Sequence, residues 1–402
     1  MNIEQARAHL IDTHIDAIRR GTRANGYMLQ SGPGVGKSKS IEQMCARLAK
    51  RLACPVGLVI EMIANLTTPD IRGFMIPIKD DKGGVPRTVF SLPPWMPDVD
   101  NIWVFTPDGE VYPPGTWDGE VPEVGVVFLD EWGQADEDVR KAAAPLILDG
   151  NVGTHFLPPA WRVVGAKNRT SDRSGTNREL MHIINRHGLM EIEGDPGCLL
   201  RHLEDLPDDD RPHILTRAFI ARQPDIVFPR EVPDKPEPFC TARTLCKMDA
   251  DLRVMMTEQD IANDKLPMTL MAAEICQGWI GKHAQGQFFT HMRFANEIPA
   301  LEDIFQNPRS AKVPAGKDAQ MVCSYMLADQ VTEDTAQAIT RYVLRFSTEM
   351  QRIAFDVMLG GHEDKDTEQT MAHIRRAKAL MPLREVQQWL VDNKDILRAA
   401  RS

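Results

Sequence analysis

The chain has 402 residues and a formal net charge of −10, with 47 Lys and Arg against 57 Asp and Glu. This length predicts two or three structural units rather than one small core. The acidic balance opposes a broad nucleic-acid-binding surface but not a narrow basic channel built by several subunits. No run of about 18 apolar residues and no signal-peptide pattern occurs, so we expect a soluble, cytoplasmic protein without a membrane span.

The cysteines and histidines are not spaced as in a disulfide framework or a metal-binding motif. Seven scattered cysteines, an odd number, favour reduced thiols in a cytoplasm-like compartment. Neither residue type has the spacing of a metal-ligand motif such as HExxH. His182 and His187 are therefore interpreted as surface or packing residues.

The first predicted elements are an amphipathic helix over residues 2–20 and a short apolar strand over residues 27–29. A glycine-rich stretch, residues 31–38, follows, and helical periodicity begins directly after it. Strand, glycine-rich loop and helix in this order are typical of a phosphate-binding P-loop. Its glycines let backbone N–H groups converge on phosphate oxygens, and the helix turns its positive end toward the anion.

Two side chains of this loop carry chemistry. Lys37 is predicted to reach the β- and γ-phosphates of ATP, and Ser38 to ligand Mg²⁺. Ser31 stands where the full motif has glycine; that glycine shapes the start of the loop, so the match weakens only slightly. The predicted nucleotide-binding residues here are Gly32, Pro33, Gly34, Val35, Gly36, Lys37, Ser38 and Lys39.

After a buried parallel strand at 56–60 and a short helix start at 67–73, turn-rich sequence interrupts the α/β rhythm up to about residue 122. Residues 74–78 are expected to pair with 85–90, and residues 103–105 with 111–112. An insertion with exposed aromatic residues is either a substrate-contacting loop or a packing flap, and the sequence leaves both open.

The sheet pattern resumes at residues 124–129 and ends in two acids, Asp130 and Glu131. An apolar strand that delivers two acids at its carboxyl end has the Walker B arrangement. Asp130 is predicted to orient hydrated Mg²⁺, and Glu131 to polarise the attacking water.

Residues 136–148 are predicted to form a helix that Pro145 kinks or loosens. A hairpin over 150–157 leads to a buried strand at 162–166, after which Asn168 is expected beside the γ-phosphate. A capping box at 176–179 then opens a helix that ends near 185–186.

Residues 188–192 read as the fifth strand, and the strand signal disappears from about residue 200. Residues 267–296 and 318–359 carry dense apolar residues at helical spacing, and their Met-rich faces are interpreted as core. A proline-rich connection precedes a helix that begins at 241–243.

Together these motifs resemble an AAA+ ATPase module, most closely the MoxR group, over about residues 25–250. The resemblance is carried by residues 32–38, 70–73, Asp130-Glu131 with Ala135, 150–158, Asn168-Arg169, Asn185-Arg186 and Thr241-Ala242-Arg243. It implies that Asn168 is sensor 1, Arg186 the arginine finger given to a neighbouring subunit, and Arg243 sensor 2. Arg169, Arg173 and Arg178 stay open as alternative fingers.

The resemblance also implies the architecture: an α/β P-loop AAA+ module with a five-stranded parallel sheet, β-hairpin inserts, an α-helical lid and a helical C-terminal extension. The expected domains are a large subdomain over 1–205 with an insert at about 73–122, a lid over 206–300 and the extension over 301–402.

By the same resemblance, the chain would couple ATP hydrolysis, with Mg²⁺, to remodelling of a protein client, and the chain would work in a homo-oligomeric ring, a hexamer. Clients in this family often carry a von Willebrand factor A domain. A nucleic-acid-stimulated motor or a nuclease-associated ATPase stays the alternative. Trp132-Gly133-Gln134 and Asn185 depart from the usual MoxR pattern.

Overall fold

The computed structural model describes residues 1–78, 87–169, 185, 187–233, 236–262, 264–359 and 371–393. The chain divides into two compact units. The first comprises residues 1–194 with 230–232, and the second residues 195–229 with 233–402. The division of the helical part into a lid and an extension stays a prediction.

The first unit is built on a seven-stranded sheet in the order β11-β1-β10-β7-β2-β5-β6. Its strands are β1 (Tyr27–Ser31), β2 (Val56–Met62), β5 (Trp103–Phe105), β6 (Val111–Tyr112), β7 (Val124–Asp130), β10 (Trp161–Asn168) and β11 (Gly188–Glu191). The first five strands of that order run parallel, as the sequence predicts. The expected β5–β6 hairpin also forms, and β5 extends the sheet by pairing antiparallel with β2, which the sequence did not predict.

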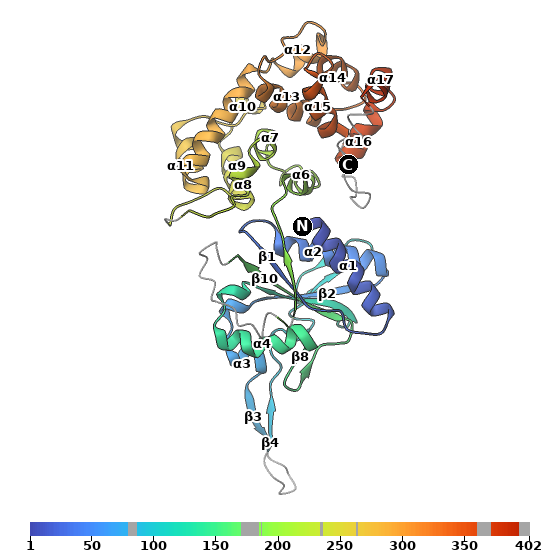
Figure 1. The fold of residues 1–402 in the computed structure, drawn as a ribbon, viewed down its shortest axis with the longest axis vertical. Coiled ribbons are helices and arrows are strands. Elements are labelled where there is room, and N and C mark those ends of the chain that lie inside the picture. Colours follow the sequence, from blue (N-terminus) through green and yellow to red (C-terminus); the bar gives the residue numbers. More distant parts are fainter. Residues whose placement is uncertain are drawn as a thin grey trace. The chain divides into compact units, whose positions relative to one another are not determined.

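Helices cover both faces of this sheet (Figure 1). They are α1 (Ile3–Arg19), α2 (Lys37–Leu52), α3 (Thr68–Arg72) and α4 (Glu137–Asp149), with the 3₁₀ turns η1 (Ile63–Asn65) and η2 (Trp132–Gln134). Side chains alternate along each strand: Val126 and Phe128 pack with α1 and α2, whereas Val127 and Leu129 pack with α4. The helix α4 continues past Pro145 to Asp149.

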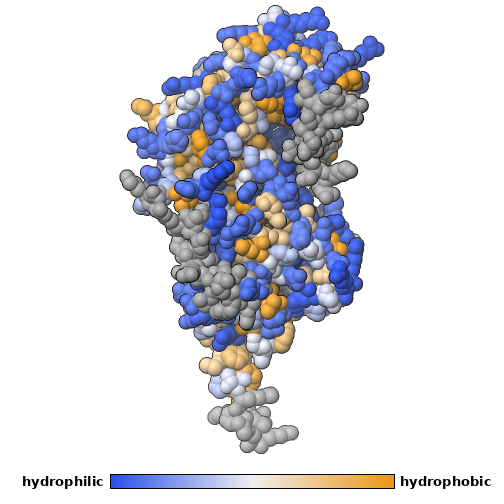
Figure 2. Space-filling model, viewed as in Figure 1, coloured by the Kyte–Doolittle hydropathy of each residue, from blue (hydrophilic) through white to orange (hydrophobic). Residues whose placement is uncertain are grey.

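The insertion after α3 divides into a buried part and an exposed arm. The arm is the predicted hairpin of β3 (Met75–Ile78) and β4 (Arg87–Phe90), which extends away from the sheet in Figure 1. Hydrophobic residues on and beside it are exposed, including Phe74 and Met75 (Figure 2). Trp95, expected among exposed aromatics, is instead fully buried and donates its indole N–H to the Ile71 carbonyl over 2.8 Å. This part of the insertion is therefore a packing flap.

A second predicted hairpin, β8 (Asn151–Val152) with β9 (His155–Phe156), follows α4. The helix expected after residue 176, together with His182, lies outside the described residues. All seven cysteines are free thiols. Within the described ranges, no helix is long and apolar enough to cross a bilayer.

The described part of the second unit consists of helices and connections. Its helices are α6 (Pro196–Glu204), α7 (Ile214–Arg222), α8 (Pro224–Val227), α9 (Ala242–Val254), α10 (Glu258–Ala262), α11 (Leu270–Phe294), η4 (Ala295–Glu297), α12 (Leu301–Gln306), α13 (Lys317–Asp329), α14 (Ala336–Val343), α15 (Thr348–Leu359), α16 (Met371–Leu380) and α17 (Arg384–Asp392). Two apolar clusters hold them together, and α13 contributes Val322 to one cluster and Leu327 to the other.

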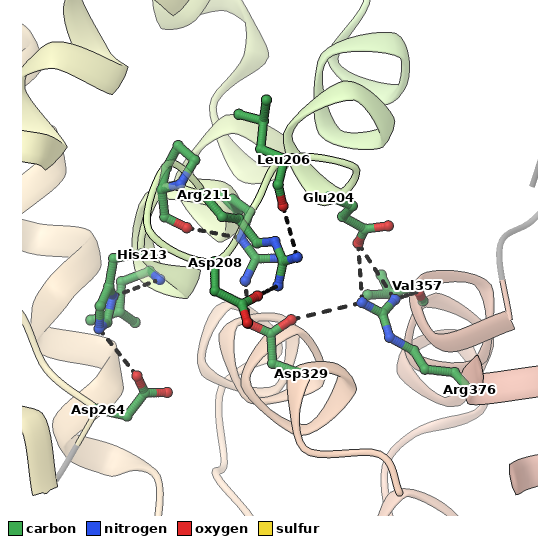
Figure 3. A network of polar contacts seen from close by, with 12 residues as sticks. Glu204, Leu206, Asp208, Arg211, His213, Asp264, Asp329, Val357 and Arg376 are labelled. Carbon is green, nitrogen blue, oxygen red and sulfur yellow. Dashed lines mark hydrogen bonds and ion pairs between the residues drawn. The ribbon is translucent and has the colours of Figure 1, made fainter. Parts of the chain in front are cut away.

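Buried charges also connect the helices of this unit (Figure 3). Glu204 at the end of α6 pairs with Arg376 over 3.4 Å and with His373 over 3.2 Å, both on α16. Asp329 at the end of α13 pairs with Arg376 and with Arg217 of α7. Because these groups are largely buried, each depends on its partners for the solvation that it loses on folding.

Candidate nucleotide-binding site

The backbone of residues 31–38 has the geometry of an anion-binding loop. β1 ends at Ser31 and α2 begins at Lys37, so the loop joins a central parallel strand directly to a helix N-terminus. Gly34 and Gly36 adopt φ values of +76° and +93°, where a side chain would strain the backbone. Among the described residues, no side chain caps the start of α2. The first amides of this helix are therefore suited to an anionic ligand.

Three neighbouring strands, β1, β10 and β7, deliver polar side chains to the same edge of the sheet. Their carboxyl ends carry Ser31, Asn168 and Asp130, and Ser31 lies opposite Asn168 in the parallel register. Ligands of open α/β sheets bind at this edge of the strands.

The ammonium group of Lys37 is held by the first two of these strands. Its Nζ donates to Ser31 Oγ over 2.8 Å and to Asn168 Oδ1 over 2.9 Å, and the Gly32 carbonyl lies 3.4 Å away. Because an ammonium can only donate, this contact requires the oxygen of the Asn168 amide to face Lys37. The NH₂ group of Asn168 is therefore directed away from Lys37 and can serve as a donor.

The third strand provides the acidic side of the site. Ser38 donates its hydroxyl to Asp130 Oδ2 over 2.6 Å, and the backbone N–H of Glu131 donates to Asp130 Oδ1 over 2.8 Å. Glu131 itself has φ +57°, a left-handed conformation that is uncommon for a non-glycine residue and recurs at functional sites. The Asp130 carboxylate thus fixes Ser38 on one side and the Glu131 backbone on the other.

This donor set fits Mg²⁺. Ser38 uses its proton toward Asp130, so its lone pairs can face a cation, and Mg²⁺ prefers such oxygen ligands. Within the described part of the chain, no group of three or more His, Cys, Asp or Glu could hold a metal. Mg²⁺ commonly takes few protein ligands and completes its shell with phosphate and water.

The side chain of Lys39, another predicted site residue, does not join this cluster. Lys39 is exposed and pairs with Glu42 over 2.7 Å, so its side chain points along the helix surface. Arg243 is exposed in the first turn of α9, in the second unit, and its role as sensor 2 stays a prediction. Arg186 lies outside the described residues, as do Arg173 and Arg178.

One alternative finger, Arg169, lies against the loop of its own chain. Its backbone N–H donates to the Ser31 carbonyl over 3.3 Å. A Cβ built on Gly32 would stand 2.6 Å from Arg169 Nη2, so the guanidinium occupies the space that a side chain at position 32 would need. Arg169 therefore adds a cation at the start of the loop.

The sequence reading missed the role of Ser31. It treated this residue as a slight weakening of the motif, whereas the structure makes its hydroxyl an acceptor for Lys37. No local pattern indicated this role, because it depends on Asn168 of the paired strand β10 lying opposite Ser31.

Comparisons with known proteins give only distant likenesses. No family model and no curated protein match the chain. Among solved structures, NtrX from Brucella abortus in complex with ADP is 14% identical with a TM-score of 0.31, and covers 93% of this chain and 68% of its own. A mutant of Thermotoga maritima RuvB is 12% identical with a TM-score of 0.30, and the match covers 94% of this chain and 89% of that one. Aeropyrum pernix Orc1 in complex with DNA is 13% identical with a TM-score of 0.35, and the match covers 98% of this chain and 83% of that one.

At such scores these likenesses carry no argument, and the assignment rests on the chain itself. The central parallel sheet, the glycine-rich loop between β1 and α2, and the acids at the end of β7 are all observed directly. The first unit is an α/β domain whose P-loop lies at the carboxyl edge of a parallel sheet.

Proposed function

We propose that the chain is a MoxR-like AAA+ ATPase that binds ATP with Mg²⁺ and couples its hydrolysis, in an oligomeric ring, to remodelling of a protein partner. One observation carries the ATPase assignment: Lys37, Ser38, Asp130 and Asn168 meet at one sheet edge through direct hydrogen bonds. A merely structural P-loop-like turn would not require the acids and the amide of two other strands at the same place.

In this proposal each group acts on a defined part of the reaction. The loop amides and Lys37 neutralise the phosphate oxygens, and Asn168 donates to the γ-phosphate or the attacking water. Glu131 orients that water and accepts its proton. Mg²⁺, held through Ser38 and Asp130, would supply electrostatic stabilisation of the phosphate charge.

The ring and its finger extend the proposal. Arg186 of one subunit would stabilise charge at the γ-phosphate of the next, so isolated subunits should hydrolyse ATP poorly. An Arg186→Ala variant should lose turnover while it keeps ATP binding, and retained turnover would refute this finger. Closure of the helical unit through Arg243 would transmit hydrolysis to the insertion.

The exposed β3–β4 arm supports a protein client. Phe74 and Met75 are 61% and 73% exposed, and apolar side chains displayed on an arm suit transient contact with another polypeptide. A client with a von Willebrand factor A domain is the form that the MoxR resemblance suggests. The net charge of −10 argues against the alternative, a nucleic-acid-stimulated motor or nuclease-associated ATPase.

The test is a pull-down with Glu131→Gln, which should bind ATP without hydrolysing it and so retain its client. The matched control is Lys37→Ala, which should bind neither ATP nor client. A protein retained with ATP after nuclease treatment supports remodelling. Recovery of nuclease-sensitive material alone, together with DNA-stimulated hydrolysis by the native chain, would favour the motor instead.

A further inference from the structure

The Ser31 side chain is buried at the start of the loop and faces the lysine of the P-loop. It is 0% exposed at the end of β1. Its hydroxyl donates to the Gly32 carbonyl over 2.8 Å and accepts from Lys37 Nζ over 2.8 Å. The hydroxyl proton is thus used by Gly32, and a lone pair is presented to the ammonium.

We propose that Ser31 is a positioning residue that, together with Asn168, holds the Lys37 ammonium in place to meet a nucleotide phosphate. This inference rests on the proposed ATPase function. It assigns a role to the one position at which the loop departs from the GxxxxGK[ST] form, where a glycine could offer no side-chain acceptor.

The geometry of the ammonium supports this role. Lys37 has three N–H donors, and its Nζ lies below 3.0 Å from the side-chain acceptors of Ser31 and Asn168, which stand on two paired strands. The Gly32 carbonyl, at 3.4 Å, makes the weakest of these three contacts. That contact is the easiest to exchange for a phosphate oxygen, which as a charged acceptor makes the stronger hydrogen bond.

Holding the ammonium in advance should favour binding. A lysine side chain is long and flexible, and ordering it when the ligand arrives costs conformational entropy. Ser31 and Asn168 impose that order through strands that are rigid parts of the sheet. If the hydroxyl instead competed with phosphate for Lys37, its removal would tighten nucleotide binding.

The experiment is a double-mutant cycle on Mg-ADP binding, measured by calorimetry for the native chain, Ser31→Ala, Asn168→Ala and the double variant. ADP is used because it lacks the γ-phosphate, so a direct contact of Asn168 with that group does not enter. Ser31→Ala should raise the Kd at least about 10-fold, the loss expected for one hydrogen bond to a charged group. The double variant should lose more than the product of the single losses, because the ammonium then lacks the acceptors of Ser31 and Asn168 together.

Ser40→Ala is the matched control. Ser40 is also a buried serine, but it lies on α2 one turn after Lys37 and outside the loop. Ser40→Ala should keep the native Kd for Mg-ADP. In the absence of ligand, Ser31→Ala should lower the midpoint of thermal unfolding by no more than Ser40→Ala lowers it.

The outcomes separate the two proposals. A native chain that binds no Mg-ADP or Mg-ATP overturns the ATPase proposal itself. A native chain that binds, with Ser31→Ala equal to or tighter than native, overturns the positioning role. Losses that simply multiply in the double variant also overturn it, because two groups that hold one ammonium cannot act independently.

Discussion

The Asp130 carboxylate has two oxygens with two different tasks, so an Asp130→Asn substitution separates them. One oxygen accepts from the Glu131 N–H over 2.8 Å, and an asparagine oxygen can keep that bond. The other accepts from the Ser38 hydroxyl over 2.6 Å, and there the new NH₂ group can only donate. Ser38 must then accept with a lone pair that would otherwise face Mg²⁺, and one negative charge is lost beside the cation.

The size of the effect follows from these contacts. Loss of a group that orients a metal ligand costs about 10–100-fold in metal affinity, or about 1.4–2.7 kcal/mol. The Mg²⁺ concentration for half-maximal hydrolysis should therefore rise by about 10–100-fold, while the fold is retained because the Glu131 bond persists. Phosphate release would be measured across a Mg²⁺ titration at fixed ATP, with thermal unfolding as the check on folding.

The control for charge alone is Asp138→Asn, which removes the same charge from an acid whose side chain is 86% exposed on α4. It should leave the Mg²⁺ titration unchanged. If Asp130→Asn and Asp138→Asn need the same Mg²⁺ concentration for half-maximal hydrolysis, the reasoning that Asp130 organises the cation side of the site is wrong.

Three other side chains allow separate tests of the site and of the fold. Arg169→Ala should lower kcat about tenfold or more if the guanidinium beside Gly32 reaches the phosphate charge, and unchanged single-turnover rates would show that it only packs on the loop. Glu204→Ala should destabilise the helical unit by up to about 3–5 kcal/mol, because buried Arg376 loses its nearer carboxylate and keeps the longer pair with Asp329. Exposed Lys378→Ala should not alter the denaturation midpoint. Burial of His14 lowers its pKa from 6.5 to about 4, so the folded chain keeps the imidazole neutral while the unfolded chain protonates it below pH 6.5. The free energy of unfolding is therefore unaffected by His14 above pH 6.5 and falls as the pH drops toward 4, by about 2 kcal/mol at about pH 5. Urea unfolding at about pH 7.5 and about pH 5 should show this loss in the native chain and a smaller one in His14→Gln; equal losses would exclude His14 as the cause.

Much of the first unit could be predicted from the sequence because its signals are local. Apolar runs bounded by turn residues located the parallel strands, and the glycines between residues 31 and 38 located the loop. The order of the motifs alone also predicted which side chains would share the sheet edge, since parallel strands end on the same side.

The burial of Trp95, the pairing of β5 with β2 and the ion pairs could not be predicted in this way. Trp95 is buried because Ile71, far from it in sequence, offers a carbonyl for its indole N–H, and nothing local distinguishes it from an exposed aromatic residue. The pairing of β5 with the edge of β2 likewise depends on which strand edge is left uncovered. Glu204 and Arg376 meet only because α6 and α16 pack in the same helical unit.

By itself, then, the sequence determined the phosphate loop, the acids of β7 and the amide after β10, because loop conformation and strand periodicity depend on near neighbours. Only the tertiary structure decided what Ser31 does. Its hydroxyl acquires a role when the α2 helix brings Lys37 back over the end of β1, and when β10 places Asn168 opposite it. A hydrogen bond among three segments is a property of their packing, and no pattern along one segment contains it.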